Sequence, residues 1–261
     1  MVSDLLKQVI DVVYLAANIF DRANIEQVEL KNNDPVNFAT NIDAEIEDTL
    51  RKHLLDIIPD SQFIGEESRL HDYHGEHLWI VDPIDGTTNF TRGLPEAAIS
   101  VGLAKNYDAV LGVVYNPITK DMWYAELGYG AYLNGERIHV SDRDIQHSLF
   151  HCYFDAYNKD CSGPAFRIAK AMYRECADIR TVGSAALALA NIACGREELL
   201  YMPHAYPWDV AAGICILNEA VGHSEVVHWY DDGTNRFDLL AGNSLKTFYV
   251  LKRKYEEAVT Q

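Results

Sequence analysis

The amino-acid sequence predicts an α+β first half, residues 1–145, followed by an α/β second half, residues 146–261. Three patterns predict this fold class: two amphipathic helical stripes near the N-terminus, a central series of short apolar segments separated by turn residues, and an alternation of strand-like and helical segments after about residue 145. With 261 residues, the chain is long enough for the halves to share a core and to form one continuous unit without disulfides.

The first half is expected to begin with two helices and to continue as a sheet. Apolar residues at helical spacing run from Leu5 to Phe20 and again from Ile42 to Ile57. The short apolar run from Leu78 to Val81 predicts a buried strand. Three further strands are expected at Ala97–Ala104, Val110–Tyr115 and Met122–Ala125. Because Asn134-Gly135 is a strong hairpin signal, this stretch is predicted to be an antiparallel meander.

The second half is expected to alternate strands with helices. Strands are predicted at Ser148–Phe154, Asp178–Val182 and Leu199–Met202. Helices are predicted at Pro164–Tyr173, Ala185–Cys194, Asp209–Val221 and Ser244–Val259. Gly222 directly follows the third of these helices and is expected to end it as a C-cap.

The charge of the chain excludes two classes of partner. A net charge of −17 repels phosphate backbones and anionic membranes, so we expect neither direct nucleic-acid binding nor membrane binding. An acidic protein that acts on an anionic substrate needs local positive charge at the site, and bound cations can supply it.

The cysteines and the N-terminus predict a cytoplasmic protein. The five cysteines are odd in number and none are at CxxC spacing, so they are interpreted as reduced thiols. Asp4 precedes any positive charge, and Asp11 interrupts the apolar stretch that follows, which argues against a signal peptide. No window of the sequence resembles a membrane span.

The segment with the most chemical information is Trp79-Ile80-Val81-Asp82-Pro83-Ile84-Asp85-Gly86-Thr87-Thr88-Asn89-Phe90. An apolar strand carries two carboxylates, those of Asp82 and Asp85, three residues apart. Two carboxylates held about 4 Å apart repel by roughly 4 kcal/mol at an effective dielectric near 20, so a cation between them is expected. Hard oxygen ligands of this kind suit Mg²⁺. The alternative is a capped turn in which Asp85 accepts a hydrogen bond from the Thr87 amide.

Backbone amides next to this pair are candidates for binding an anion. Gly86 permits close approach of the backbone, and Gly86, Thr87 and Thr88 could present their N–H groups to a phosphate at the start of a helix.

Two further acidic segments flank this one. Gly65-Glu66-Glu67-Ser68 follows the apolar pair Phe63-Ile64, and the alternative interpretation of its glutamates is a solvated loop. Trp208-Asp209-Val210-Ala211-Ala212-Gly213 begins an apolar helix, so the alternative role of Asp209 is an N-cap.

Taken together, the three acidic segments resemble a known family. GEES, WIVDPIDGTTNF and WDVAAG occur in this order, and the set is similar to the inositol monophosphatase family of the lithium-sensitive, metal-dependent phosphatase superfamily. The resemblance extends over nearly the whole chain. It implies a layered αβαβα sandwich of the inositol monophosphatase and fructose-bisphosphatase type, and a homodimer.

The resemblance also implies an activity. The expected reaction is Mg²⁺-dependent hydrolysis of a small-molecule phosphomonoester, inositol monophosphate first, by a metal-activated water. Two or three Mg²⁺ ions per site and inhibition by Li⁺ are implied with it. The alternatives are another substrate of the superfamily (a fructose bisphosphate, a nucleotide 3′-phosphate or NADP) and, from a different class, a non-catalytic regulatory relative.

Individual roles follow from the resemblance residue by residue. The implied metal ligands are the side chains of Glu66, Asp82, Asp85 and Asp209 and the backbone carbonyl of Ile84. Glu66 and Thr87 are implied to orient the attacking water, with Asp43 supporting them. Gly86, Thr87 and Thr88 are implied to hold the phosphate. Gly183, Ser184, Ala185 and Asp209 are implied to lie against the rest of the substrate.

One position departs from the family pattern. Where animal inositol monophosphatases have a glutamate that reaches hydroxyls of the inositol ring, this sequence has Met202. A thioether cannot replace a carboxylate as the acceptor for two hydroxyls, so selectivity for inositol is expected to be relaxed or shifted.

Two weaker candidates are interpreted as surface features. His71, His74 and His77 are spaced at three, but they lie in a polar segment with Gly75 and are interpreted as a loop. Lys31 matches a family lysine on the loop before the second helix.

Overall fold

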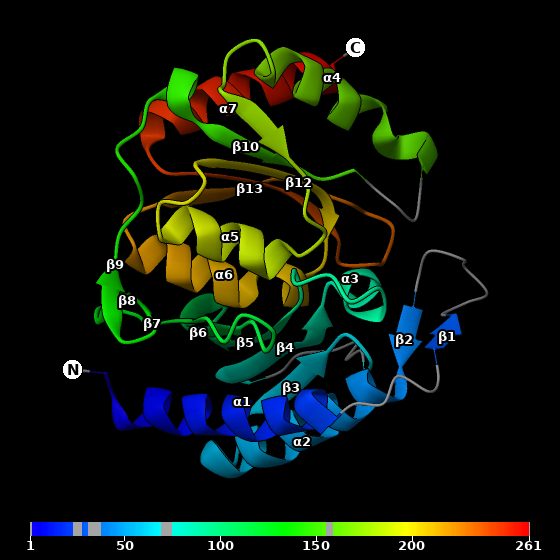
Figure 1. Cartoon of the computed structure of the whole chain (residues 1–261), viewed down its shortest axis with the longest axis vertical. Coiled ribbons are helices and arrows are strands. Elements are labelled where there is room, and N and C mark those ends of the chain that lie inside the picture. The colour runs from blue at the N-terminus through cyan, green and yellow to red at the C-terminus, as the bar shows by residue number, and fades with distance from the viewer. Residues whose placement is uncertain (1, 23–27, 31–37, 69–74, 155–158, 261) are drawn as a thin grey trace.

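The computed structural model describes residues 2–22, 28–30, 38–68, 75–154 and 159–260. His71, His74 and Lys31 therefore lie outside the described residues. Figure 1 shows five layers: two helices, a large sheet, two helices, a smaller sheet and two outer helices. The predicted αβαβα sandwich is confirmed.

The first layer is formed by α1 (Asp4–Arg22) and α2 (Asn41–Ile57), which pack against each other and against the large sheet. In α1 the fully buried residues include Leu6, Val9 and Val13, whereas Leu5 and Val12 are only partly buried. The apolar face is therefore rotated slightly from the predicted stripe, because it faces both α2 and the sheet. A short antiparallel ladder pairs β1 (Val28–Leu30) with β2 (Phe38–Thr40).

The large sheet has the strand order β3-β4-β5-β6-β7-β8-β9. Its strands are β3 (Gln62–Gly65), β4 (His77–Asp85), β5 (Ala98–Lys105), β6 (Asp108–Tyr115), β7 (Met122–Glu126), β8 (Gly130–Leu133) and β9 (Glu136–Ile138). From β4 to β9 the strands form the predicted antiparallel meander, while β3 pairs parallel to β4. Asn134 and Gly135 both have positive φ, 51° and 92°, as a two-residue hairpin turn requires.

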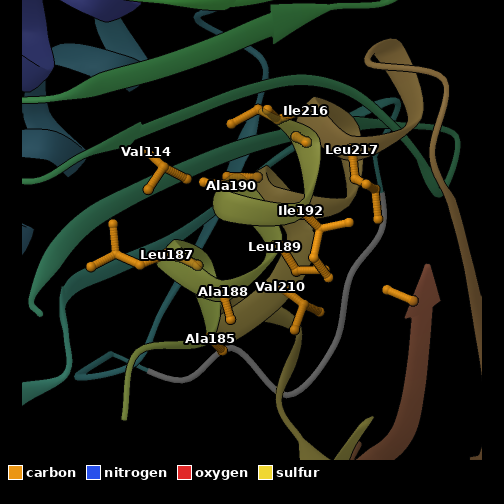
Figure 2. Packing of buried hydrophobic residues seen from close by; sticks show 14 of the residues in the cluster. Val114, Ala185, Leu187, Ala188, Leu189, Ala190, Ile192, Val210, Ile216 and Leu217 are labelled. Atoms are coloured by element: carbon orange, nitrogen blue, oxygen red, sulfur yellow. The ribbon is translucent and has the colours of Figure 1, made fainter. Parts of the chain in front are cut away.

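The middle layer is formed by α5 (Ala185–Ala193) and α6 (Pro207–Glu219), which lie between the two sheets. Figure 2 shows the apolar side chains around α5, which is buried over almost all of its length. Small residues allow this close packing. A Cβ placed on Gly112 of β6 would overlap the Ala212 carbonyl oxygen, so a glycine is required where α6 crosses the sheet.

The smaller sheet has the order β11-β10-β12-β14-β13 and is mixed. Its strands are β10 (Leu149–Cys152), β11 (Asp178–Arg180), β12 (Leu199–Ala205), β13 (His223–Trp229) and β14 (Phe237–Gly242). β10 runs parallel to β11 and β12, whereas β14 runs antiparallel to β12 and β13. The last two strands were not expected from the sequence, because β13 is a half-exposed edge strand that starts with the polar run His223-Ser224-Glu225.

The outer layer is formed by α4 (Gly163–Met172) and α7 (Leu245–Val259), which pack together over the smaller sheet. Ser244 caps α7 by accepting a hydrogen bond from the Thr247 amide. Two short 3₁₀ helices, Ile145–His147 and Lys159–Ser162, lie at either side of β10 in the chain. The C-cap of α6 is Ala220, and the positive φ that follows it is that of Val221, 69°, so the prediction of Gly222 as the C-cap is wrong.

Two general expectations can be compared with the described residues. Cys152, Cys176, Cys194 and Cys215 are free, and Cys161 lies where no side chain is described. Within the described ranges, no helix is both long enough and apolar enough to cross a membrane.

Candidate active site

The end of β4 brings the central carboxylate pair into the interior. Asp82 is 2% exposed and Asp85 is 8% exposed. The pairing of β4 with β5 shifts register between these two residues, so a β-bulge separates the paired positions of Asp82 and Asp85. The Ile84 amide donates a hydrogen bond to Asp82 Oδ1 at 3.0 Å, which fixes the turn between them.

Asp85 is held by the second half of the chain. The Ser184 hydroxyl and the Ala186 amide donate hydrogen bonds to Asp85 Oδ2 at 2.6 and 2.7 Å. Ser184 is also the N-cap of α5, where its Oγ accepts from the Leu187 amide at 3.4 Å. The hydrogen bonds of Asp85 thus cross the fold to the N-terminus of α5, where negative charge is favourable, and do not close the local turn considered above.

The pKa shifts of this pair reveal a cluster of acids. Burial, and then the neighbouring carboxylates of Glu66, Asp85, Asp209 and Asp43, raise the pKa of Asp82 well above its ordinary value. Burial is also the largest cause that raises the pKa of Asp85 to about 6, although the hydrogen bonds from Ser184 and Ala186 oppose it. Five carboxylates from distant parts of the sequence therefore lie close enough to repel one another.

Gly86 forms the turn that leads from β4 into α3 (Thr87–Thr91). Its φ is 93°, and a Cβ there would lie 2.6 Å from the Glu96 carbonyl oxygen and 3.1 Å from that of Gly183. Only glycine accepts both constraints. Thr87 and Thr88 are the first residues of α3, so all three residues predicted to hold phosphate lie in one turn, with Thr88 exposed to solvent.

We expect Gly86→Ala to destabilise the chain by more than the usual penalty for a positive φ. The φ alone costs about 1–2 kcal/mol for a residue with a Cβ, and the approach to the Glu96 carbonyl adds to it. Gly93→Ala is the matched control, because Gly93 has a φ of 69° but nothing within 4 Å of its Cβ position. Urea unfolding of both variants measures the difference. Equal losses of unfolding free energy would show that the contact with Glu96 does not matter.

Asp43 and Thr87 lie next to each other. Asp43 lies in the first turn of α2 and is fully buried. The Thr87 hydroxyl lies 2.9 Å from the Ile84 carbonyl oxygen and 3.4 Å from Asp43 Oδ1, and it can donate its proton to either. This leaves the lone pairs of Thr87 Oγ1 to accept a hydrogen bond from a third group.

Glu66 directly follows β3 and lies near Asp82 and Asp85, since its charge contributes to raising the pKa of both. Its amide donates to the Val81 carbonyl at 3.2 Å, which continues the parallel pairing of β3 with β4 one residue further. The adjacent Glu67 amide donates to Oε2 of the buried Glu47 at 2.9 Å. The backbone of Glu66 is thus held by β4 and that of Glu67 by α2. This differs from the solvated loop of the alternative interpretation.

Asp209 is the third residue of α6. Its Oδ2 accepts a hydrogen bond from the Tyr206 amide at 2.8 Å, so it does cap the helix start, although from inside the first turn and not from the N-cap position. Its charge also raises the pKa of Asp82. Asp209 therefore both caps the start of α6 and belongs to the carboxylate cluster.

The segment 183–185 lies directly against the Gly86 turn. Gly183 is exposed, Ser184 is buried on Asp85, and the Ala185 side chain is buried in the cluster of Figure 2. Only the backbone of Ala185 is thus available to the site, and its amide contributes to lowering the pKa of Asp85.

Four residues around the site were missed from the sequence. Asn89 Nδ2 donates to the carbonyls of Val182 and Glu96, at 2.6 and 2.8 Å, and so fastens α3 to the segment before α5. Glu47 leaves no room for a side chain at Gly65, whose Cβ would overlap its carboxylate. Asn89 belongs to the segment Trp79–Phe90, and Glu47 is four residues from Asp43 on one helix face, so the sequence offered a reason to consider both residues.

The other two missed residues, His151 and Tyr153, stack on each other with ring centroids 4.8 Å apart. Burial and the carboxylates of Asp85, Glu197 and Asp209 raise the pKa of Tyr153, which keeps the phenol protonated next to the acidic cluster.

The comparison with known families agrees with this arrangement. A model of the inositol monophosphatase family matches residues 2–258. The chain belongs to the inositol monophosphatase family. Inositol monophosphatase 1 of Solanum lycopersicum is 34% identical over 258 residues, covering 96% of this chain and 92% of that relative.

Other relatives of this inositol monophosphatase family member carry a different name. The Nus factor SuhB of Xylella fastidiosa is 30% identical over 236 residues, which cover 88% of this chain and 85% of the relative. The crystal structure of the extragenic suppressor protein suhB from Bartonella henselae matches with a TM-score of 0.88 at 28% identity, covering 98% of this chain and 99% of that one.

The donor set of this inositol monophosphatase family member fits Mg²⁺ in its chemistry. All candidate ligands are hard oxygens, and mutual repulsion among the acids is what a cation relieves. In the part of the chain that the structure describes, no three His, Cys, Asp or Glu side chains already converge as a closed metal cluster. The hydrogen bonds of Asp82 and Asp85 go to Oδ1 and Oδ2 respectively, and the carboxylates would need to turn the remaining oxygens toward a bound ion.

Proposed function

We propose that this chain is a Mg²⁺-dependent phosphatase for a small-molecule phosphomonoester, with inositol monophosphate as the leading candidate. The observation that carries the proposal is the gathering of Asp43, Glu66, Asp85 and Asp209 around the buried Asp82, where each raises the pKa of the central carboxyl. A protein without a cation at this place gains nothing from such repulsion.

The proposed ligands are the carboxylates of Glu66, Asp82, Asp85 and Asp209 with the carbonyl of Ile84. Two or three Mg²⁺ ions held there would supply a nucleophilic water at neutral pH and positive charge for the leaving oxygen. The Ile84 carbonyl already accepts from Thr87 at 2.9 Å and has a second lone pair to offer.

Thr87, Asp43 and Glu66 are proposed to orient the attacking water. With its proton donated toward Asp43 or Ile84, Thr87 Oγ1 can accept a hydrogen bond from that water. The Glu66 carboxylate can accept the second proton. The buried Asp43 lies beside the Thr87 hydroxyl, and β4 holds the backbone of Glu66, which favours a single orientation of the nucleophile.

The substrate is proposed to lie over the turn at Gly86 and the start of α5. Gly86, Thr87 and Thr88 would donate backbone N–H groups to phosphate oxygens. Gly183 and Asp209 would face the rest of the substrate, and the backbone of Ser184 and Ala185 would lie beside it. A Cβ on Gly86 would lie 3.1 Å from the Gly183 carbonyl oxygen, so these two segments are neighbours and a phosphate on one would place the alcohol part near the other.

A phosphate-release screen over metabolite phosphates tests the proposal directly. Purified protein with Mg²⁺ should release phosphate from inositol 1-phosphate or a related ester, and EDTA should stop the release. A homodimer, inhibition by Li⁺ and a cytoplasmic location belong to the same proposal. Absence of hydrolysis for every ester, in protein that binds Mg²⁺, would contradict it.

The second candidate is a regulatory protein that keeps the fold without turnover. Relatives named Nus factor SuhB favour this candidate. The net charge of −17 disfavours direct binding to RNA, so a partner would be a protein. The same screen separates the two candidates, since only the enzyme releases phosphate.

Selectivity for inositol is expected to be relaxed or shifted, because Met202 stands where the family glutamate is expected. Met202 lies in β12 and packs against the apolar cluster between the sheets. Each charge-assisted hydrogen bond that is lost costs roughly 1.5–3 kcal/mol. We expect comparable kcat/KM for inositol 1-phosphate and for glycerol 2-phosphate, fructose bisphosphate, a nucleotide 3′-phosphate or NADP. A preference of several hundredfold for inositol 1-phosphate over all the others would contradict this expectation.

A further inference from the structure

The buried His151 lies behind the candidate site with both ring nitrogens occupied. It belongs to β10 and is fully buried. Its Nδ1 is 2.9 Å from Glu197 Oε2, and the Val182 amide donates to its Nε2 at 3.2 Å. Glu197 is itself buried and is held by Asn191 Nδ2 at 3.2 Å. No role in the chemistry proposed above uses this histidine.

The two contacts agree on one form of the ring. The Val182 amide can only donate, so Nε2 must offer its lone pair, and the ring proton must be on Nδ1. An ionised Glu197 can only accept, so it favours this same Nδ1–H form. Stacking on Tyr153, with ring centroids 4.8 Å apart, fixes the plane of the ring. The tautomer and the orientation of His151 are therefore determined by its surroundings.

What His151 holds is the peptide that precedes the start of α5. The N–H of Val182 donates to His151, and the carbonyl of Val182 accepts from Asn89 at 2.6 Å. Two residues further on, the Ser184 hydroxyl donates to Asp85 at 2.6 Å. A shift of the Val182 peptide would therefore move both donors that grip Asp85, those of Ser184 and Ala186.

We propose that His151, oriented by Glu197, is a positioning residue that sets the segment 182–186 against Asp85. The proposal depends on the proposed function for its kinetic consequence only. The arrangement has the form of a supporting shell around a metal ligand, whose loss commonly costs 10–100-fold in affinity or activity.

Two amide substitutions separate the contact of His151 with Val182 from its contact with Glu197. In His151→Gln the side-chain oxygen can reach the place of Nε2 and accept from Val182. In His151→Asn the shorter side chain can reach only the place of Nδ1, so it contacts Glu197 and leaves the Val182 amide without its acceptor. Both remove the ring and its stacking on Tyr153, which makes them matched controls for each other.

The kinetic test compares kcat and the Mg²⁺ concentration for half-maximal rate. His151→Asn is expected to lower kcat by about 10–100-fold and to raise the Mg²⁺ requirement, whereas His151→Gln retains most of both. KM for the phosphate ester should change less than kcat. If both variants lose stability but keep the wild-type kcat and the wild-type Mg²⁺ requirement, His151 is only structural and the proposal is wrong.

If the protein releases no phosphate, the tautomer of His151 can still be measured, because this measurement needs no activity. Long-range ¹H–¹⁵N spectra should show one histidine ring in the Nδ1–H form, absent from His151→Gln. Glu197→Gln should keep this ring in the Nδ1–H form, because the glutamine oxygen can accept that proton and the Val182 amide still needs the lone pair of Nε2. A wild-type His151 with its proton on Nε2 would overturn the proposal, whatever the fate of the proposed function.

Discussion

Asp85→Asn is expected to lower Mg²⁺-dependent phosphate release by about a thousandfold while the chain remains folded. Asparagine still offers an oxygen to the Ser184 hydroxyl and the Ala186 amide, so the link between the halves survives. The charge that would hold the cation is lost, and about 4 kcal/mol of transition-state stabilisation corresponds to a factor of a thousand. Asp82→Asn and Asp209→Asn should behave alike.

The measurement is kcat for purified variants at saturating Mg²⁺, with circular dichroism to confirm folding. Asp108→Asn is a suitable control, because Asp108 is an exposed carboxylate at the start of β6. It should keep the wild-type rate. Turnover by Asp85→Asn within a few-fold of wild type would refute the assignment of Asp85 as a ligand.

The second large effect is a metal-dependent stability that varies with pH. Without metal, the folded-state pKa of Asp85 is about 6, above its ordinary value of 3.8, so between these values the folded chain binds more protons than the unfolded chain. The free energy of unfolding therefore falls as pH rises through this window. The difference between these two pKa values corresponds to about 3 kcal/mol of unfolding free energy, and the full loss is present above pH 6. Asp82 adds to the loss in the same direction.

Melting curves in EDTA and in Mg²⁺, at pH 5 and pH 7.5 and at equal ionic strength, test this expectation. Mg²⁺ at a hundred times its Kd should add about 2.7 kcal/mol, and it should raise the melting temperature more at pH 7.5 than at pH 5. Metal-free Asp85→Asn should melt above metal-free wild type at pH 7.5. Identical curves with and without Mg²⁺ at pH 7.5 would count against a metal site.

Much of the candidate site could be predicted because its acids lie in continuous segments next to apolar strands. Asp82 and Asp85 end a strand, and the structure brings Glu66, Asp209 and Asp43 close to Asp82. The groups that orient these acids could not be predicted in the same way. Ser184 reaches Asp85 across 99 residues, and Asn89 reaches Val182 across 93, and neither contact leaves a periodic signal.

The fold shows the same division between local and distant information. Helices and meander strands were predicted because their apolar patterns are strong. β13 escaped prediction because its half-exposed edge position leaves a mixed pattern, and β14 because its short apolar run depends on strands from both sides. His151 and Glu197 gave no signal at all, since a buried polar pair has no spacing rule.

The dependence of Asp85 on donors from the far half has a consequence for biosynthesis. The partner amide of Ala186 lies 101 residues further along the chain, so a ribosome needs about 5–20 s to deliver it after Asp85. During that interval the nascent β4 carries its carboxylates without the α5 helix that later grips one of them. The strands of the β-meander can pair at once, but Asp85 lacks its donors from Ser184 and Ala186 until α5 has been made. Burial of Asp85 at the end of β4 should therefore wait for the second half of the chain.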